Sequence, residues 1–488
     1  MPPQHGAEWY KIDLKRGSMK TLIKNGTLVT ASETFTSDIL IEDEKITRIG
    51  LDLEIDSAHR VDATGKLVMP GGIDPHVHLD LQMFDTVSSD DHYTGHKAAA
   101  FGGTTTVMDF VVLEDKGFDH SVDVWMKMAQ KAAIDYSFHM NLTRFNEKIA
   151  KEIPSLMKMG IQTLKVFTAY NGRLRLDDGG IFKALQIARD NGMLVMAHCE
   201  NGDVIETLTA QALAEKRTSP IWHALTRPAW GAVEATLRMA AMAEQADAPV
   251  YIVHMNAGGE VDMLKYARER GVKVMGETCP QYLFFTMDHL ARPDGAKWIC
   301  SPPMRTEMDN ARIWEGLSQN ILQTIGTDHC PFFYNGTHPI LYEGSEVAIP
   351  GKELGRDDFT KIPNGLPGIQ DRMPILWTYG VNAGYITPNQ FVAYMSTNPA
   401  KIFGLYPQKG ALLPGSDADI VIWDPEKQVK YGVAHSHQRT DYNLYEGWEL
   451  TGYPEKVFLR GKLIVDEDEW KGKRGDGKFL KRSEGMIL

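Results

Sequence analysis

Four histidines, one lysine and one aspartate stand at the ends of short apolar segments along the chain. They are His76, His78, Lys165, His198, His254 and Asp328. Alternate residues of a strand point to the same side, so the two imidazoles of His76-Val77-His78 can chelate one ion. A single histidine at the end of a strand is commonly structural. Four histidines and an aspartate at one end of one sheet instead predict a metal site.

The lysine is the unusual member of this set, because an ammonium group cannot bind a metal ion. A lysine made neutral by burial and by nearby cations can react with carbon dioxide, and the resulting carbamate has oxygens that can bridge two ions. The alternative is a buried ion pair between Lys165 and Asp328. The residues alone leave these two interpretations equally open.

Eight apolar segments in the middle of the chain must position these residues, and they alternate with segments of helical periodicity. The apolar segments are 73–79, 104–112, 136–142, 163–170, 193–200, 250–256, 272–279 and 322–330. Eight repeats of strand and helix predict a closed parallel barrel, the (β/α)8 or TIM-type fold. A doubly wound open sheet would usually have a glycine-rich loop that opens a helix. Here Gly102-Gly103 leads into a strand, which favours the barrel.

Short β segments with tight turns occur at both ends of the chain. Asn25-Gly26 is a typical turn sequence near the N-terminus, and similar segments return at 418–423 and 457–465. We predict a smaller β-sandwich-like domain built from both termini, residues 19–70 and 405–469. The barrel then occupies residues 71–404. Two unrelated β caps are the alternative.

The composition narrows the classes of function. The 488 residues carry 52 Lys and Arg against 64 Asp and Glu, a net charge of −12, and 43% are hydrophobic, as in ordinary globular proteins. The negative charge disfavours nucleic acid as a partner, and no apolar run is long enough to span a membrane. The four cysteines are far apart, which indicates neither a disulfide framework nor a cysteine-type zinc site. These features predict a cytoplasmic protein.

The two ends of the chain differ in character from the rest. Residues 1–18 lack the apolar core of a signal peptide and look like a leader added for expression that ends in Gly17-Ser18. Residues 470–488 are rich in lysine, arginine and glycine and are too polar to form a core of their own. We expect this C-terminal tail to be disordered or docked on another subunit.

Eight motifs distributed over the chain belong together. They are GGIDPHVH at 71–78, LKVFTAY at 164–170, AHCEN at 197–201, VH at 253–254, GETCPQY at 276–282, SPPMR at 301–305, GTDHCPF at 326–332 and KIPNG at 361–365. In this combination the chain, from Met19 onward, resembles the hydantoinases and dihydropyrimidinases. These form the cyclic-amide branch of the amidohydrolase superfamily. His-x-His alone is shared by the whole superfamily, whereas the full set is specific.

The resemblance implies a site with two divalent metal ions, usually zinc, bridged by a hydroxide and by an N6-carboxylated Lys165. One ion would be bound by this group and by His76, His78 and Asp328. The other would be bound by the same group and by His198 and His254. Two cations at such a site lower the pKa of a bound water to near 7, which gives a nucleophile at neutral pH.

The resemblance also implies roles for the groups around the metals. Asp328 would act as general base and then as general acid toward the leaving ring nitrogen. Tyr170 would donate a hydrogen bond to the developing oxyanion, although on spacing alone it would be a core residue. Ser301 and Asn364 would hold the ring amide largely through main-chain atoms, and residues 301–303 are equally compatible with a rigid turn.

The implied activity is hydrolysis of 5,6-dihydropyrimidines or 5-substituted hydantoins to N-carbamoyl amino acids, by a homotetramer. A dihydroorotase is disfavoured because Leu79-Asp80 follows His78 and supplies no cation for a substrate carboxylate. Allantoinases share the metal set, but the match at 361–365 favours the hydantoinase group. Collapsin-response mediator proteins are non-catalytic scaffolds that lack the full metal set, which is complete here. Residues 334–350 look like an insertion that could narrow or gate the barrel mouth.

Overall fold

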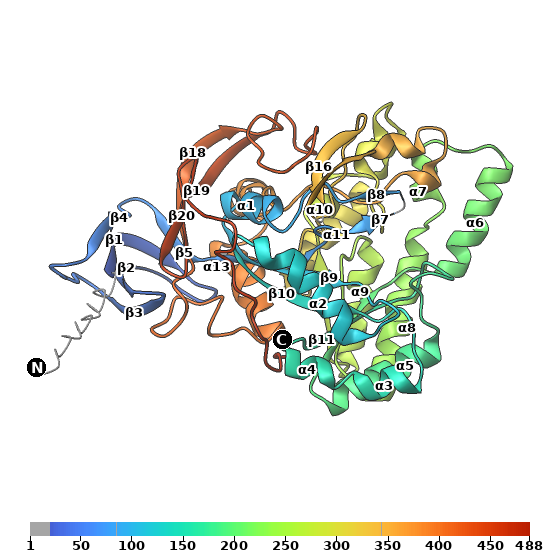
Figure 1. The fold of residues 1–488 in the computed structure, drawn as a ribbon, viewed down its shortest axis with the longest axis horizontal. Helices are drawn as coiled ribbons and strands as arrows, with labels where there is room; N and C mark the ends of the chain where they lie inside the picture. Colours follow the sequence, from blue (N-terminus) through green and yellow to red (C-terminus); the bar gives the residue numbers. More distant parts are fainter. Residues whose placement is uncertain (1–19, 84, 343) are drawn as a thin grey trace, which may run out of the picture.

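The computed structural model describes residues 20–83, 85–342 and 344–488, so the leader predicted at residues 1–18 lies outside the described residues. A barrel of parallel strands occupies the middle of the molecule, and a β domain flanks it (Figure 1). In the described part of the chain, no helix combines the length and the apolar character needed to cross a membrane.

Eight parallel strands form the barrel in the order in which they occur along the chain. They are β6 (Gly72–Val77), β9 (Thr104–Val111), β10 (Asp135–Asn141), β11 (Thr163–Phe167), β12 (Leu194–His198), β13 (Val250–Ile252), β14 (Val274–Thr278) and β15 (Thr324–Ile325). The first strand meets the chain after the last through a parallel bridge between Val77 and His329. The hydrogen bond from His78 N to His329 O, at 2.8 Å, lies at the same seam. The predicted barrel is confirmed, and each predicted segment overlaps one of these strands.

Helices surround the barrel on its outside (Figure 1). The longer ones are α2 (Phe118–Met128), α5 (Asp178–Asp190), α6 (Gly202–Ala214), α8 (Ala229–Ala246), α9 (Gly258–Glu269) and α11 (Glu307–Ser318). Asp177 caps α5 by accepting a hydrogen bond from Gly180 N, which satisfies one of the free N–H groups of the first turn. The buried stripe of α8 consists mostly of alanines, so this helix can lie close against β13.

Shorter helices fill the connections. They are α1 (Thr94–Phe101), α3 (Glu147–Glu152), α4 (Ser155–Met159), α7 (Ile221–Leu225), α10 (Gln281–Phe284), α12 (Arg372–Leu376), α13 (Pro388–Val392) and α14 (Asn398–Ile402). Two π-helical segments, η6 (Trp377–Val381) and η7 (Ala393–Thr397), continue α12 and α13.

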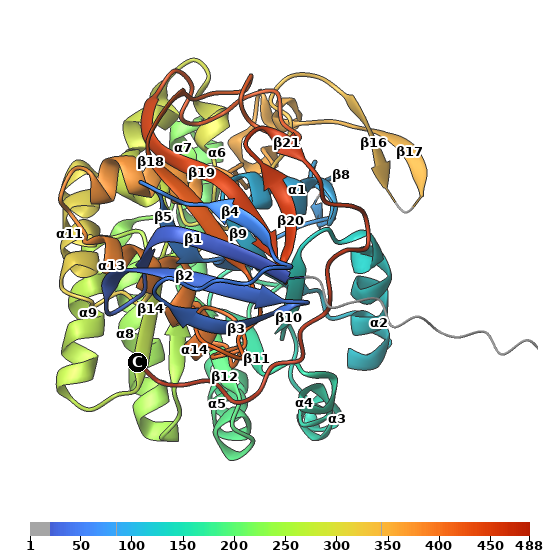
Figure 2. The ribbon, with the colours of Figure 1, turned by 90° about the vertical axis from the view of Figure 1, so that its left-hand side faces the viewer.

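One sheet joins the two ends of the chain (Figure 2). Its N-terminal strands are β1 (Lys20–Val29), β2 (Thr34–Glu42), β3 (Lys45–Gly50), β4 (His59–Asp62) and β5 (Leu67–Pro70). Its C-terminal strands are β18 (Ile420–Lys430), β19 (Glu449–Leu459), β20 (Lys462–Asp466) and β21 (Glu469–Trp470). β5 pairs antiparallel with β18, with Met69 opposite Val421. A β domain assembled from both termini is therefore confirmed, and two separate caps are not observed.

The polar tail is ordered along its own barrel, so the predicted disorder is wrong, while docking on another subunit stays a prediction. Leu480 N donates to Tyr136 O at 2.7 Å, and the Arg482 guanidinium donates to Phe138 O. Both acceptors are main-chain carbonyls of β10, so the tail extends along the barrel through hydrogen bonds to its main chain that the composition of the tail does not reveal.

Residues 334–350, which we predicted to be an insertion, contain the paired strands β16 (His338–Tyr342) and β17 (Ser345–Ile349). The hairpin that they form packs on a second small hairpin, β7 (Gln82–Met83) with β8 (Thr86–Val87). Val87, Phe333, Ile340 and Ile349 form one apolar cluster there. The Thr86 hydroxyl also donates to Pro350 O at 2.7 Å. The two hairpins thus support each other.

Candidate active site

The seam of the barrel brings the first and last predicted ligands together. His76 lies on β6 and His78 just after it, while Asp328 follows β15. Asp328 Oδ1 lies 3.2 Å from His76 Nε2 and 3.1 Å from His78 Nε2. The main chain fixes this arrangement, because Asp328 N donates to His76 O at 2.9 Å.

The neighbouring strands bring the other predicted ligands to the same end of the barrel. His198 ends β12 and His254 follows β13 by two residues. His198 Nδ1 lies 3.0 Å from His254 Nε2, and the ring centroids of His76 and His254 are 5.3 Å apart. His76, His254 and Asp328 each offer one ligand atom within 4.8 Å of the others, which makes them a candidate metal site.

The chemistry of these donors fits a metal ion. Among the described residues, His76 Nε2 and His254 Nδ1 are buried and make no hydrogen bond. Burial, together with the charge of Lys165, lowers the pKa of both imidazoles well below the usual histidine value. Both rings are therefore neutral at pH 7, which is the form that binds metals.

Two buried glutamates, to which the sequence assigned no role, orient the histidines. Glu277 Oε1 lies 2.7 Å from His76 Nδ1, and Glu200 Oε2 lies 2.8 Å from His198 Nε2. Carboxylates that hold the second ring nitrogen of a ligand fix its tautomer. Burial raises the pKa of Glu277 to about 7. Burial is also the largest single influence at Glu200, but the interaction with His198 and the charges of Arg227 and Arg305 together outweigh it and lower the pKa to about 2. Glu277 lies in the motif GETCPQY and Glu200 in AHCEN. Their presence in these motifs is the sequence feature that could have pointed to a role at the site.

Lys165 lies on β11 with its ammonium group among aromatic rings. Its Nζ is 4.9 Å from the ring centroid of Phe110 and 5.4 Å from that of Phe167. Burial lowers the pKa of Lys165 to about 8, against the opposing charges of Asp328 and Glu277. Within the described ranges no carboxylate oxygen pairs with this lysine at 4.0 Å or less. The simple ion pair with Asp328 is thus not formed.

Phe110 is a further residue that sequence reasoning missed. Its ring centroid lies 4.6 Å from that of His76, 4.9 Å from that of His78 and 4.8 Å from that of His139. The Phe110 ring is thus an apolar contact surface for the rings of His76 and His78. In sequence it is one apolar residue among many in a buried strand, so nothing distinguished it.

Tyr170 reaches the cluster from the loop after β11. Its ring centroid lies 5.1 Å from that of His198, and its φ of 67° is in the left-handed region. Asp328 and His254 share this conformation, with φ values of 54° and 39°. Such backbone conformations are costly for residues other than glycine and concentrate at functional sites. Burial raises the pKa of the Tyr170 hydroxyl, so it remains a hydrogen-bond donor at neutral pH.

The loops of Ser301 and Asn364 lie next to each other. Ser301 Oγ is 3.2 Å from His223 Nε2. A hydrogen bond with the Ser301 hydroxyl also lowers the pKa of Tyr170, against the larger effect of burial. Gly365, directly after Asn364, donates its N–H to Ile299 O at 3.0 Å. Both residues are partly exposed, as are His78, Tyr170 and Asp328, so the cluster opens to solvent on this side.

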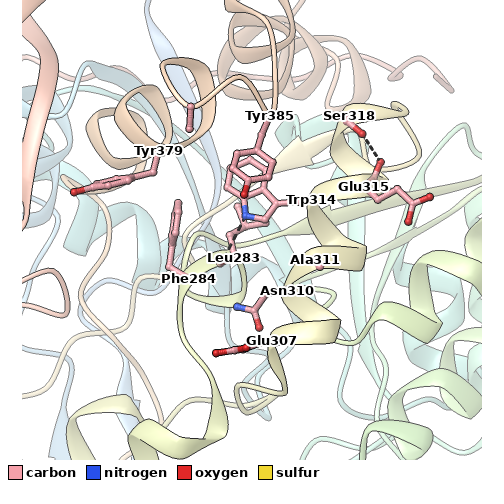
Figure 3. A pocket seen from close by; sticks show the side chains of 11 residues that line it. Leu283, Phe284, Glu307, Asn310, Ala311, Trp314, Glu315, Ser318, Tyr379 and Tyr385 are labelled. Atoms are coloured by element: carbon pink, nitrogen blue, oxygen red, sulfur yellow. Dashed lines mark hydrogen bonds between the residues drawn. The ribbon is translucent and has the colours of Figure 1, made fainter.

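A separate hollow of about 630 Å³ lies around α10, α11 and η6 (Figure 3). Trp314 and Tyr385 stack along it with ring centroids 4.7 Å apart. None of the predicted site residues lines this hollow, so it is distinct from the histidine cluster.

Comparison with known proteins agrees with this geometry. The chain matches the amidohydrolase family over residues 67–464. D-hydantoinase of Geobacillus stearothermophilus is 44% identical over 96% of this chain and 97% of its own length. D-hydantoinase of Streptomyces coelicolor is 41% identical over 96% of this chain and 100% of its own.

Solved structures give the same result. Dihydropyrimidinase from Brevibacillus agri has a TM-score of 0.92 and 46% identity, with 96% of this chain and 100% of that chain covered. L-hydantoinase from Arthrobacter aurescens has a TM-score of 0.84 and 27% identity, with 95% and 99% covered. The chain therefore belongs to the amidohydrolase family, within its hydantoinase and dihydropyrimidinase group.

Proposed function

We propose that the protein hydrolyses the cyclic amide bond of 5,6-dihydropyrimidines or 5-substituted hydantoins and releases N-carbamoyl amino acids. The observation that carries this proposal is the convergence of four histidines, Asp328 and a buried lysine at one end of a barrel, the lysine having no carboxylate partner among the described residues. The similarity to hydantoinases and a dihydropyrimidinase over nearly the whole chain supports the substrate class.

The proposed cofactor is a pair of divalent ions, preferably zinc. His76, His78 and Asp328 would hold one ion, and His198 and His254 the other. The 3.1 and 3.2 Å contacts of Asp328 and the 3.0 Å approach of the second histidine pair support two adjacent sites. When bound, two such ions supply an activated water and polarise the ring carbonyl.

We further propose that Lys165 is carboxylated on its side-chain nitrogen and bridges both sites. In this reaction the neutral amine forms a nitrogen–carbon bond to carbon dioxide and releases one proton. The lowered pKa of about 8 makes the neutral amine accessible near pH 7, because burial penalises the ammonium form. The product carries a negative charge and two oxygen ligands where the lysine offered none.

The remaining groups would act on the substrate itself. Asp328 accepts the proton of the attacking water and delivers it to the leaving ring nitrogen. Tyr170 donates its O–H to the carbonyl oxygen as negative charge develops there. Ser301 and Asn364 hold the ring amide mainly through main-chain groups, which fixes the carbonyl against the nucleophile.

A panel of dihydrouracil, dihydrothymine, phenylhydantoin and allantoin tests this function directly. We expect hydrolysis of at least one of the first three, loss of activity after chelation, and recovery with added zinc. Activity on allantoin alone would instead assign the protein to the allantoinases. No hydrolysis by zinc-loaded protein would favour a non-catalytic scaffold.

We also propose a homotetramer. Several apolar side chains on α6, α7 and α8 are exposed, including Leu225 at 42% and Trp230 at 78%, and such surfaces commonly mark subunit contacts. Light scattering of the purified protein tests this, and a monomer at micromolar concentration would contradict it.

A further inference from the structure

Lys352 is buried just after the β16–β17 hairpin, between the two loops assigned to substrate binding. Its side chain is 1% exposed. Its Nζ donates to Ile299 O and to Pro363 O, both at 3.1 Å. Ile299 precedes Ser301 by two residues and Pro363 precedes Asn364 by one. One lysine thus connects the main chains of both loops.

The same junction contains two more main-chain links. Ile299 O also accepts the N–H of Gly365 at 3.0 Å, so this carbonyl oxygen receives two donors. Cys330 N donates to Leu366 O at 3.0 Å. Cys330 lies two residues after Asp328, so the loop of Asn364 is tied both to the loop of Ser301 and to the barrel seam.

The surroundings of Lys352 are not what stability alone would favour. Among the described residues no carboxylate forms an ion pair with it, and burial lowers its pKa to about 7. A buried lysine without a counter-charge is costly, and a methionine of similar length would fill the same space without this cost. What the lysine adds is hydrogen bonding to two carbonyls, which both the amine and the ammonium can provide.

We propose that Lys352 is a positioning residue that sets the spacing between the Ser301 and Asn364 loops. This inference rests on the proposed function, which assigns these loops to the ring amide. Main-chain groups that hold one small ring must keep a fixed separation, and small displacements of such groups are costly for binding and rate. The lysine contributes to this spacing by donating to one main-chain carbonyl of each loop.

The test compares Lys352→Met in the zinc-loaded enzyme with Lys409→Met. Lys409 is equally buried but is held by three aspartates outside the site. For Lys352→Met we expect KM to rise at least roughly tenfold, with kcat changed less than about threefold and with metal content and Tm preserved. Lys409→Met should lower Tm and leave KM unchanged. Lys352→Gln, which keeps a donor, should give an intermediate KM and serves if the methionine variant does not fold.

Hydrogen exchange of the main chain gives a second readout that does not need activity. Peptides covering 299–301 and 363–365 should exchange roughly tenfold faster in Lys352→Met and not in Lys409→Met. If wild-type protein hydrolyses no cyclic amide, the proposed function fails, and exchange alone decides whether the lysine fixes the loops. Unchanged exchange would overturn the inference. So would faster exchange with an unchanged KM in active enzyme, because the spacing would then not matter to the substrate.

Discussion

Two lysines in this molecule are buried to the same degree in opposite surroundings. Lys165 is 2% exposed and Lys409 is 1% exposed. Lys409 Nζ lies 2.6 Å from Asp135, 2.7 Å from Asp419 and 3.1 Å from Asp417. Lys165 has histidines and the Phe110 ring around it and no carboxylate at ion-pair distance among the described residues. Their pKa values accordingly move apart: burial lowers that of Lys165 to about 8, while the aspartates overcome burial and raise that of Lys409.

The location of each lysine explains the difference. Asp135 begins β10, at the amino end of the barrel, and Asp419 directly precedes β18 of the β domain. Lys409 therefore connects barrel and β domain with matched charge. Lys165 faces the carboxyl end, where barrel proteins place their chemistry. Lys409, buried with matched counter-charges, has the surroundings of a structural residue, whereas Lys165, buried without them beside the candidate metal ligands, has those of a reactive one.

The largest expected effect is that of Lys165→Ala. Without the bridging carbamate, both metals should bind weakly and activity should fall by at least about 10³-fold, while the barrel remains folded. Metal analysis and activity should be measured with and without acetate or propionate in the presence of zinc. A small acid that bridges the ions should restore part of the activity. Full metal occupancy without added acid would contradict the carbamate.

Lys409→Met tests the other half of the comparison. Removing the ammonium leaves three buried aspartates without their shared partner, which should cost about 3–5 kcal/mol of the free energy of unfolding. Urea denaturation checks this value, and kinetics at a temperature where the variant is folded should show unchanged kcat and KM. A loss of activity without a loss of stability would reverse the assignments of the two lysines.

Tyr170→Phe extends the comparison to hydroxyl groups. If the hydroxyl stabilises the oxyanion, kcat should fall by roughly 10²–10³ with little change in Tm. The matched control is Tyr394→Phe, whose hydroxyl donates to Asn320 Oδ1 at 2.7 Å away from the site. That variant should lose about 1 kcal/mol of stability and no rate. A rate loss below threefold in Tyr170→Phe would make it a packing residue.

Periodicity was sufficient to predict the barrel and to bring the candidate ligands to one end of it, because buried parallel strands are short apolar runs whose carboxyl ends lie at the same end of the barrel. His198 and His254 could be placed in this way before any contact was known. Strand lengths were less predictable: residues 322–330 contain only the two-residue strand β15, since the seam is completed by the bridge at His329.

The parts that sequence could not give depend on contacts between distant segments. Glu277 orients His76 across 201 positions of sequence, and the importance of Phe110 follows only from the rings around it. The left-handed backbone of Tyr170 is also invisible in sequence, because tyrosine has no preference for it. Of the three aspartates around Lys409, Asp135 begins β10 of the barrel, and Asp417 and Asp419 lie just before β18 of the β domain, and none stands out locally.

The smallest expected effect is a difference in how the two lysines respond to pH. The folded-state pKa of Lys165 is about 8 and its ordinary value is 10.5, so between these values the unfolded chain binds more protons than the folded one. Stability should therefore rise with pH through this window. Lys409 has the opposite sign: its raised pKa contributes stability that is fully present below pH 10.5 and is lost at higher pH.

The pH dependence that Lys165 contributes to stability can be measured on metal-free protein in buffer without carbon dioxide, because no carbamate then forms. We expect Lys165→Met to be more stable than wild type at pH 7.5 by on the order of 1–3 kcal/mol, since the variant buries no charge. This advantage should shrink as pH approaches 10, where the wild-type lysine is neutral in the folded state and its unfolded state has begun to lose the same proton. Urea denaturation at several pH values measures the difference, with Lys409→Met as the control whose deficit stays constant over this range. A constant difference between wild type and Lys165→Met would show that Lys165 is not the titrating group, and its use as an amine nucleophile toward carbon dioxide would lose its physical basis.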